Sequence, residues 1–495
     1  TYGKMKRILI KFSIIILVLS AMTSCQKWLD IDYDPNAITD SPAINEGVYL
    51  IGVESEWAQQ AVTFFVWWNG MKDWLLWYAS DGTQGYETRF EISTDYGGEI
   101  WGAYSGALMH SNALYEKAKE NGNKRFQGIG AVITAWHWFN MADYYDQAPL
   151  DEALKGAEFP YPQVNSLEEI YAHANGLLDE AIECFTASDP GDLVPTAAQD
   201  YIFGADFAKW TRLCYSLKAR YAMRLTYLPG KTPAGQADLV LQYLQNGMQA
   251  NTDMCAWKHQ ASLQFDSYIY EESLYDYSAA GMTPSVYIVD LLNDLNDPRR
   301  MKFWTLAEAG GYIGHRSGTS SVAGNRPSRW SMTYCTQTYP DMLMMYSENL
   351  FLKAEANALK GQYGPAEAAM KAGIRADMEY HGVAEDDIVA YLAQPELTMP
   401  TNVEAAQELV MTQKYIANTF ETTESYFDFI RTGYPKLDFT TINQVINTNT
   451  FPRRNPYPPD EIEKNPSVAA LGQPDYFRKG TAWDTKPFSW RSDTK

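Results

Sequence analysis

The amino-acid sequence predicts an all-α protein in which paired helices stack around one fully buried helix. Residues 126–145 are apolar on nearly every face of a helical wheel, so other helices must surround them. Amphipathic stretches recur in pairs joined by short turns, with Ala at close-contact positions, as in tetratricopeptide arrays. Residues 251–340 lose this helical texture and predict long irregular loops. The expected fold is a tetratricopeptide-like helical array with such loops.

The central stretch, 126–154, begins as a helix and ends in a turn. Its large apolar side chains are Ile129, Val132, Ile133, Trp136, Phe139 and Met141. Thr134, His137 and Asn140 form one narrow polar stripe. We interpret them as core polar groups with hydrogen-bond partners, because buried polar atoms are retained when they are paired. The run Asp143-Tyr-Tyr-Asp-Gln-Ala-Pro149 ends the helix.

Further helices are expected from periodicity and from their start and stop signals. Ser166 and Glu169 form a capping box at the start of one of them. Gly361 and Gly364 bound the turn between the last pair. The spacing is irregular, which indicates a degenerate array. The expected ranges are one helix from 46 to 78, then 101–119, 166–185, 207–227, 232–250, 284–295, 341–360 and 365–380.

The N-terminus has the order of a bacterial lipoprotein signal. Basic residues precede an apolar run, Phe12 to Met22, which is short for a membrane span, and Thr23-Ser24-Cys25 follows. We expect 1–24 to be a signal peptide with extra residues 1–4, Cys25 to be acylated, 25–42 to be a lipidated tether and 43–495 to be a single domain. An ordinary secretory signal that contains a Cys is the alternative.

Charge and aromatic content restrict the class of partner. Lys and Arg number 40 against 61 Asp and Glu, giving a net charge of −21, which argues against binding a nucleic acid. The chain holds 15 Trp and 34 Tyr, more than a core of this size needs. Some of these aromatic side chains are therefore expected at the surface in a binding role.

Catalytic and metal-binding signatures are missing from the sequence. There is no G-x-S-x-G or H-E-x-x-H, and Gly230-Lys231-Thr232 lacks the upstream Gly of a P-loop. The four downstream cysteines have no zinc spacing, and Cys184 and Cys214 read as core residues. The acidic run 290–297 lacks the order of a calcium loop. We expect no catalytic residue, metal or cofactor, with glycoside hydrolysis as a minor alternative.

Aromatic residues gather where the first helix is expected to end. Trp74, Trp77 and Tyr78 precede the polar, Gly-rich loop 79–98, which carries Tyr86 and Arg89. Rings beside such a loop suit a stacking platform for a ligand. The alternative is that they close the hydrophobic end of the array.

Short motifs along nearly the whole mature chain resemble the SusD-like (SusD/RagB) family of surface lipoproteins. Among them, Arg220, Arg224, Glu348 and Glu355 are expected to be paired interior charges that fix helix register. The motifs are Leu29-Asp30, Asp34-Pro35-Asn36, Asp143-x-Tyr145-x-x-x-Pro149, Glu152-Ala153-Leu154, Ile170-Tyr171, Gly204-x-x-x-x-Lys209-Trp210, Ser216 to Arg224, Asp297-Pro298-Arg299, Tyr346-Ser347-Glu348, Ala354-Glu355-Ala356, Arg431 to Pro435, Phe451-Pro452-x-Arg454, Tyr457-Pro458, Glu461 and Asn465.

The resemblance implies a binding protein that captures oligosaccharides or oligopeptides at the outer membrane. It implies delivery to a SusC-like TonB-dependent transporter, with an exposed C-terminal stretch, 455–495, as part of the interface. It also implies that the loop after the first helix and the middle region converge on the ligand. The middle-region candidates are Tyr268, Tyr270, Arg316, Arg326 and Trp330. A stand-alone surface adhesin is the alternative.

Overall fold

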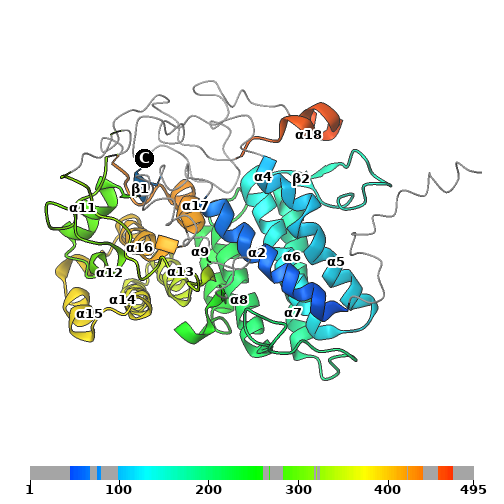
Figure 1. The fold of residues 1–495 in the computed structure, drawn as a ribbon, viewed down its shortest axis with the longest axis horizontal. Helices are drawn as coiled ribbons and strands as arrows, with labels where there is room; N and C mark the ends of the chain where they lie inside the picture. The colour runs from blue at the N-terminus through cyan, green and yellow to red at the C-terminus, as the bar shows by residue number, and fades with distance from the viewer. Residues whose placement is uncertain are drawn as a thin grey trace, which may run out of the picture. The chain divides into compact units, whose positions relative to one another are not determined.

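Helices make up nearly all of the regular structure, as the sequence predicts (Figure 1). The computed structural model describes residues 45–66, 75–79, 98–259, 267, 283–316, 319, 324–420, 422–438 and 455–471. The expected signal peptide, Cys25 and the tether lie outside these residues. The chain divides into two units, Thr1–Asn45 and Glu46–Lys495. Within the described residues, no helix combines the length and the apolar character needed to cross a membrane.

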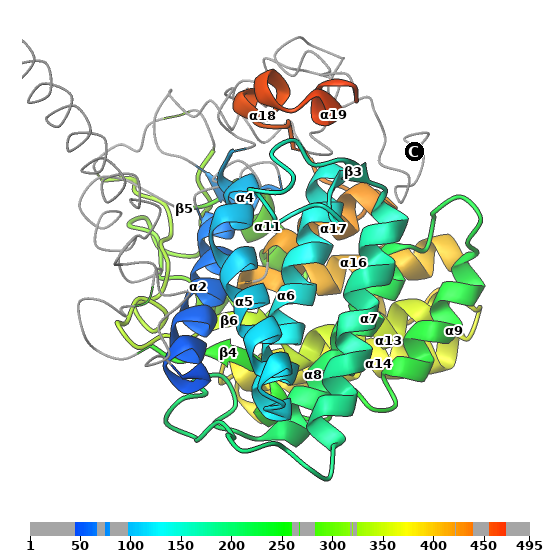
Figure 2. The same ribbon diagram turned by 90° about the vertical axis from the view of Figure 1, so that its right-hand side faces the viewer.

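The long helices stack in chain order (Figure 2). Helix α2 packs on α5, and successive contacts then join α5, α6, α7, α8, α9, α13, α14 and α16. The main helices are α2 (Glu46–Val66), α5 (Ala107–Glu120), α6 (Lys124–Tyr145), α7 (Leu167–Thr186), α8 (Phe207–Arg224), α9 (Pro233–Tyr243), α13 (Tyr346–Leu359), α14 (Tyr363–Tyr380), α15 (Glu385–Leu392), α16 (Val403–Ala417) and α17 (Thr422–Thr432).

Short elements complete the fold. They are the helices α4 (Gly98–Trp101), η4 (Gly102–Ser105), η5 (Asn251–Asp253), α11 (Val286–Asp294), α12 (Arg300–Phe303), η6 (Pro395–Leu397), η7 (Asn418–Phe420), α18 (Pro459–Lys464) and α19 (Pro466–Ala469). The strands are β1 (Tyr78–Ala79), β2 (Ala148–Pro149), β3 (Val164–Asn165), β4 (Cys255–Trp257), β5 (Thr283–Pro284) and β6 (Asp341–Met344). They pair two by two, β1 with β5, β2 with β3, and β4 with β6.

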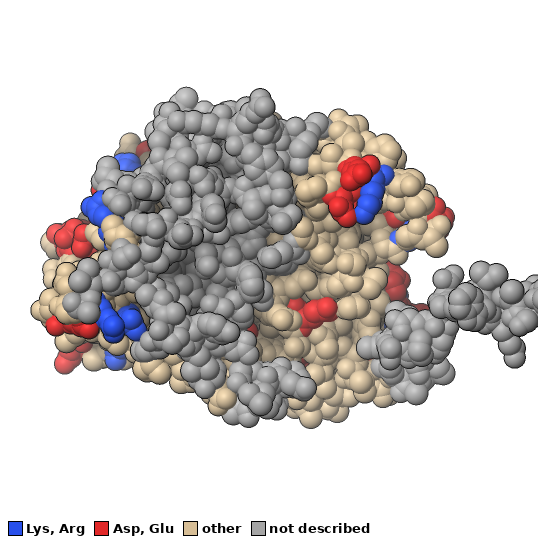
Figure 3. Space-filling model, turned by 45° about the horizontal axis from the view of Figure 1, so that its top comes forward, with Lys and Arg blue, Asp and Glu red and all other residues tan. Residues whose placement is uncertain are grey.

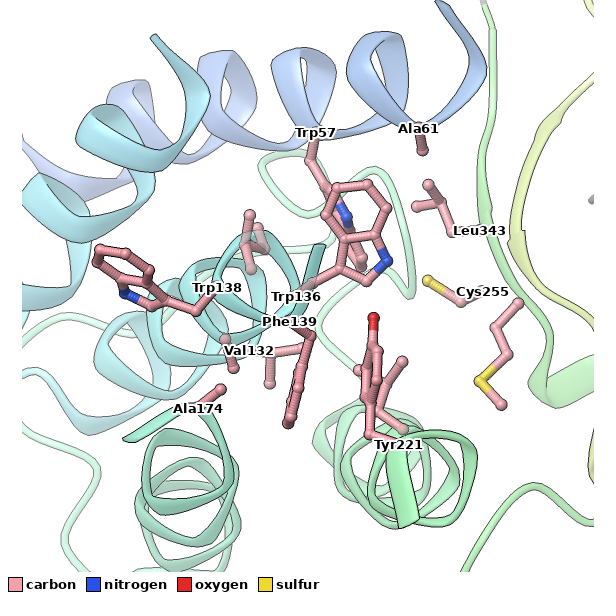
Figure 4. Packing of buried hydrophobic residues seen from close by; sticks show 14 of the residues in the cluster. Trp57, Ala61, Val132, Trp136, Trp138, Phe139, Ala174, Tyr221, Cys255 and Leu343 are labelled. Atoms are coloured by element: carbon pink, nitrogen blue, oxygen red, sulfur yellow. The ribbon is translucent and has the colours of Figure 1, made fainter. Parts of the chain in front are cut away.

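Helix α6 is the buried centre of the array, as predicted. Every residue from 126 to 145 is buried except Asn140. Figure 4 shows Phe139 lying against Tyr221 of α8, with ring centroids 3.7 Å apart and planes at 11°. At Gly130 a Cβ would lie 2.8 Å from the Tyr115 backbone nitrogen, so only glycine permits this approach to α5.

The polar stripe of α6 is only partly satisfied, contrary to the prediction. The Asn140 side-chain amide donates to the Trp136 carbonyl (2.8 Å). Among the described residues, Thr134 Oγ1 and His137 Nε2 are buried without a hydrogen-bond partner. Burial lowers the pKa of His137 to about 3, so this imidazole is neutral in the core.

Three other sequence predictions need correction. The expected helix 46–78 is wrong at its end, because α2 is Glu46–Val66 and residues 75–79 form a turn followed by strand β1. The expected helix 341–360 begins as strand β6, which pairs with β4, and turns helical at Tyr346. A short apolar run suits a buried strand or a buried helix equally, and here the partner strand decides. The expected helix 101–119 breaks at Gly106, which has non-helical φ and ψ of −131° and −119°.

Part of the expected exposed C-terminal stretch is packed against the end of α6. Asn455 N donates to the Tyr144 carbonyl (2.8 Å), and the Tyr457 hydroxyl donates to the Tyr145 and Gln147 carbonyls (3.0 and 2.8 Å). Tyr457 is 1% exposed. The Tyr457 ring is buried at the end of α6, a contact that the local sequence around Tyr457 does not predict. Residues 472–495 lie outside the described residues.

A buried network of charges ties four distant helices together. The Arg220 guanidinium of α8 donates to the Glu348 carboxylate of α13 (Nε to Oε1, 2.8 Å). One turn later, Arg224 donates to Asp143 of α6 (3.0 Å) and to Glu424 of α17 (2.8 Å). Burial raises the pKa of Asp143 to about 6, against the opposing effect of Arg224. The predicted pairing of the interior charges is confirmed.

The network continues through α16 and α17. Arg431 donates to both oxygens of Glu355 (2.6 and 2.8 Å) and to Asp428 (2.8 Å). Lys414 lies 2.7 Å from Asp428 and 4.0 Å from Glu348. It therefore links the charges around Arg431 to those around Arg220. Burial opposes ionisation of Asp428, but Lys414, Arg431 and Arg224 outweigh it and hold its pKa at about 2. Asp428 therefore stays charged and paired inside the core.

Arg220→Met should lower the free energy of unfolding by about 3–5 kcal/mol, because Glu348 would be left buried with Lys414 at 4.0 Å as its nearest cation. The measurement is chemical denaturation followed by circular dichroism. Lys464→Met is the control, since Lys464 forms an exposed pair with Asp460 and should leave stability close to wild type. Equal effects of the two changes would show that the interior network does not hold the array.

Candidate ligand-binding site

The loop after the first helix and the middle region meet in the structure. Strand β1 pairs antiparallel with β5, with Tyr78 opposite Pro284 and Ala79 opposite Thr283. The Thr283 hydroxyl donates to the Ala79 carbonyl (3.0 Å). Two segments some 200 residues apart in the chain therefore lie side by side. The rest of the expected loop, 80–97, lies outside the described residues.

A third segment lies on the other side of β5. Ser285 forms a parallel bridge with His315. His315 N donates to the Pro284 carbonyl (2.8 Å), and Val286 N donates to the His315 carbonyl (3.0 Å). At Gly314 a Cβ would lie 2.3 Å from the Ser285 oxygen and 2.5 Å from the Val286 Cα. The two segments can approach this closely only because position 314 has no side chain.

Two further segments extend the same arrangement. Ser328 N donates to the Ile313 carbonyl (2.9 Å), which places 326–331 beside 311–316. Trp304 and Trp330 form an antiparallel bridge, and Thr305 N donates to the Arg329 carbonyl (2.8 Å). We call the five segments 75–79, 283–286, 311–316, 326–331 and 303–308 the loop platform. Backbone hydrogen bonds, rather than a regular sheet, hold it together.

Helix α16 and β5 clamp the first platform segment. The Tyr415 hydroxyl donates to the Leu75 carbonyl (2.7 Å), and the Ser285 hydroxyl donates to the Leu76 carbonyl. Ser285 N donates to the Trp77 carbonyl (3.2 Å). Leu76 has a φ of 57°, in the left-handed region that a leucine rarely adopts. Three successive carbonyls are thus fixed, and they hold a strained turn directly before Tyr78.

Trp77 is part of the core. Its side chain is 1% exposed, and its ring lies 4.4 Å from that of Tyr415. The turn at Leu76 directs this indole inward, so its faces are covered by protein and are not open to a ligand in this structure. The alternative noted for the end of the first helix, closure of the hydrophobic array, describes the position of Trp77.

A second group of buried charges anchors the platform to α14. Arg299, 0% exposed, donates to Asp297 (2.6 Å) and to Asp377 of α14 (2.8 Å). The acidic run 290–297 is therefore a helix end followed by an ion pair, as expected. Among the described residues, no three His, Cys, Asp or Glu side chains are grouped so that they could hold a metal ion.

The remaining candidates are distributed between the platform and undescribed parts of the chain. Trp330 is half-buried, with its ring 6.4 Å from Phe303 and 6.2 Å from Tyr334. Arg316 and Arg326 are exposed on the platform, and Tyr78 contributes its backbone to β1. The candidates outside the described residues are Trp74, Tyr86, Arg89, Tyr268 and Tyr270.

Sequence reasoning missed several surface side chains of this region. Leu306 is 62% exposed, Met332 56% and Ile313 43%, all on or beside the platform. Arg329 directly precedes Trp330 in the same segment. The sequence gives only one indication that these side chains are exposed, which is their position in a non-helical stretch. Exposed apolar residues in loops follow no periodic pattern.

Comparison with known families gives a direct match. The sequence model of the SusD-like family, described as "starch-binding associating with outer membrane", matches residues 69–458. The chain belongs to the SusD-like family. A comparison with curated protein sequences found no match.

Solved SusD-like structures share the fold. A SusD/RagB family protein from Bacteroides thetaiotaomicron is 22% identical with a TM-score of 0.71, covering 91% of this chain and 100% of that one. A SusD homolog from Bacteroides fragilis is 21% identical with a TM-score of 0.73, covering 89% and 99%. A chitin-binding SusD homolog from Flavobacterium johnsoniae is 19% identical with a TM-score of 0.73, covering 90% and 99%.

Gly314→Ala should separate the platform segments, because the new Cβ would meet backbone atoms of Ser285 and Val286 that cannot rotate away. We expect a loss of about 1–3 kcal/mol in the free energy of unfolding, typical of overpacking. Thermal and chemical denaturation measure it. Gly176→Ala, at an exposed and open position of α7, is the control and should be neutral or stabilising. Equal stability of both variants would contradict the close approach at Gly314.

Proposed function

We propose that this SusD-like protein is a surface lipoprotein that binds an oligosaccharide on the loop platform and passes it on unchanged. The observation that carries this proposal is the backbone-bonded set of loop segments, in which a half-buried Trp330 lies against Phe303 and Tyr334. Exposed Arg326 lies on the same segment as Trp330, and exposed Arg316 lies on the segment beside it. A ring that is held in place on one side presents a preorganised surface for the C–H faces of a sugar. The family description and the chitin-binding homolog with this fold support a glycan as the ligand.

The proposal assigns no chemistry to the protein. The buried carboxylates nearest the platform, Asp297 and Asp377, are bonded to Arg299 and so are committed to structure. Asp143, whose pKa burial raises to about 6, lies inside the array and accepts hydrogen bonds from Arg224 and Tyr171. The role is capture, in which the platform raises the local concentration of a nutrient.

The proposed organisation places the platform on a tethered body. Residues 1–24 would be removed, Cys25 would carry the lipid, and 25–42 would connect it to the domain 43–495. A tethered binding protein beside a SusC-like TonB-dependent transporter converts delivery into an intramolecular step with a high effective concentration. The proposed ligands are oligosaccharides. Oligopeptides are the second class of ligand that the family resemblance implies.

Trp330→Ala should weaken binding of the preferred oligosaccharide about 5- to 100-fold, taking ~1–3 kcal/mol per stacked aromatic ring as the scale. Calorimetry of the soluble mature domain against a panel of oligosaccharides and oligopeptides measures this, and wild-type affinity should be micromolar to millimolar. Tyr161→Ala, 58% exposed on the loop between β2 and β3, is the control. Unchanged affinity in folded Trp330→Ala would place the site elsewhere.

Cys25→Ala should release the protein from membranes, because acylation requires that thiol. Fractionation of cells grown on the inducing nutrient measures the release. With the wild-type Cys25, mild detergent extraction and pull-down of a tagged copy should recover a large barrel protein of the transporter class. A Cys25→Ala variant that stays with membranes would refute the anchor. Recovery of the wild type alone would favour the stand-alone adhesin.

A further inference from the structure

The charge of the loop platform is opposite to that of the chain as a whole. The protein carries a net charge of −21, yet between positions 299 and 340 it has six Lys or Arg residues and a single carboxylate. That carboxylate is Glu308. The cations are Arg299, Arg300, Lys302, Arg316, Arg326 and Arg329. Such a local reversal creates a field that attracts anions to this part of the surface.

Two of these cations serve the fold and the others lie at the surface. Arg299 is fully buried between Asp297 and Asp377. The Arg300 guanidinium donates to the Leu292 carbonyl (3.1 Å) and the Asn293 carbonyl (3.4 Å). By contrast, Arg316 and Arg326 are exposed, and Lys302 and Arg329 are half-buried. Figure 3 shows Lys and Arg side chains together with Asp and Glu side chains on the left, the side on which Figure 1 draws α11 and α12.

The platform places Arg326 and Arg329 on one segment and Arg316 on the segment beside it. Glu308 N donates to the Arg326 carbonyl (3.1 Å), and Thr305 N donates to the Arg329 carbonyl (2.8 Å), so 326–329 runs along 305–308. Arg316 follows His315, which is bonded to β5 on the opposite side of the same platform. Glu308 Oε1 is 3.8 Å from Arg326 Nε, and both side chains are largely solvent-exposed, so this pairing is weak.

The cations also lie next to the aromatic part of the platform. Arg329 and Trp330 are consecutive, and Trp330 bridges to Trp304. A ring that stacks on a sugar and a guanidinium that binds an acidic substituent of the same sugar act together. Arginine suits the second role because its planar fork binds a carboxylate or sulfate through two parallel hydrogen bonds.

We propose that the platform selects anionic oligosaccharides, which carry uronic-acid carboxylates or sulfate esters, over neutral ones. This inference rests on the proposed function and specifies its substrate class. Selection comes from the arginines of the platform, and Trp330 supplies affinity shared by charged and neutral sugars. Because exposed charges are screened by salt, binding weakens as ionic strength rises.

The test is calorimetry of the soluble mature domain with oligogalacturonate, the same oligomer fully methyl-esterified, a sulfated oligosaccharide, and neutral chito- and malto-oligosaccharides. We expect the carboxylated or the sulfated probe to bind at least 10-fold more tightly than neutral oligomers of equal length. If the carboxylated probe is the ligand, its methyl ester should lose that advantage. Affinity should fall between 50 and 500 mM NaCl, because the Debye length shortens from about 14 Å to about 4 Å over this range.

Arg326→Gln and Arg329→Gln should each weaken binding of the anionic probe about 10-fold or more, the range for hydrogen bonds to charged groups. They should leave the binding of neutral probes unchanged. Arg375→Gln is the matched control, because Arg375 pairs with Glu385 at the surface of α14, away from the platform segments.

The outcomes separate the inference from the proposed function. Equal, salt-insensitive binding of charged and neutral oligosaccharides would overturn the anionic selectivity while leaving a glycan-binding role intact. Failure of the wild type to bind any oligosaccharide would overturn the proposed function itself. Variants that keep full affinity for the anionic probe but lose the transporter in pull-downs would assign the cations to an acidic protein partner and refute the inference.

Discussion

The structure depends on charges that are buried and paired inside the helical array. Arg220 and Arg224 of α8 reach α13, α6 and α17, and Arg431 and Lys414 close the network from the other side. Burying such groups is costly, and their mutual attraction offsets that cost only when each partner is in place. Helices that slipped by one turn would strand an ion in the core. The network therefore selects one register for helices whose apolar faces, rich in Ala, would tolerate several.

Three consecutive residues of α16 connect the buried charge network to the middle region and to the loop platform. Lys414 belongs to the charge network, pairing with Asp428. Gln413 accepts a hydrogen bond from Tyr391 (3.1 Å) and lies 3.5 Å from Arg299, which anchors the middle region. The Tyr415 hydroxyl holds the Leu75 carbonyl in the platform. Helix α16 is fixed by buried ions, and it contributes one side chain each to the charge network, the middle region and the loop platform.

This arrangement suits a protein that binds without chemistry. A rigid helical body fixes the ends of irregular segments, and the segments meet through backbone hydrogen bonds that leave side chains available for recognition. The left-handed turn at Leu76 and the close approach at Gly314 concentrate strain and tight packing at the point where these segments converge. Ordering the platform before the ligand arrives lowers the entropy lost on binding. In the proposed function the rings contribute affinity, and in the proposed selectivity the charges distinguish anionic from neutral sugars.

Part of the candidate site follows from sequence and part does not. The family resemblance implied that the first loop and the middle region converge on a ligand, and in the described residues the start of that loop, β1, pairs with β5 of the middle region. From its place at an expected helix end, Trp77 is a candidate ring for stacking on a ligand. The turn at Leu76 instead places its side chain in the core. The backbone bridge between Trp304 and Trp330 has no sequence signature. Contacts of this kind depend on what lies opposite, which local patterns do not encode.

The sequence alone determined the all-α class, the buried helix over 126–145, the capping box at Ser166 and the pairing of interior charges. Those features follow from helical periodicity, from short-range hydrogen bonding and from the cost of burying an unpaired ion. Only the tertiary structure decided that 341–344 is a strand and that Gln407, Gln413 and Lys414 are buried in α16. The sequence pattern over 403–417 predicts no helix, because buried polar residues interrupt the apolar stripe. Their burial is possible only because Glu355, Arg299 and Asp428, from distant segments, supply their partners.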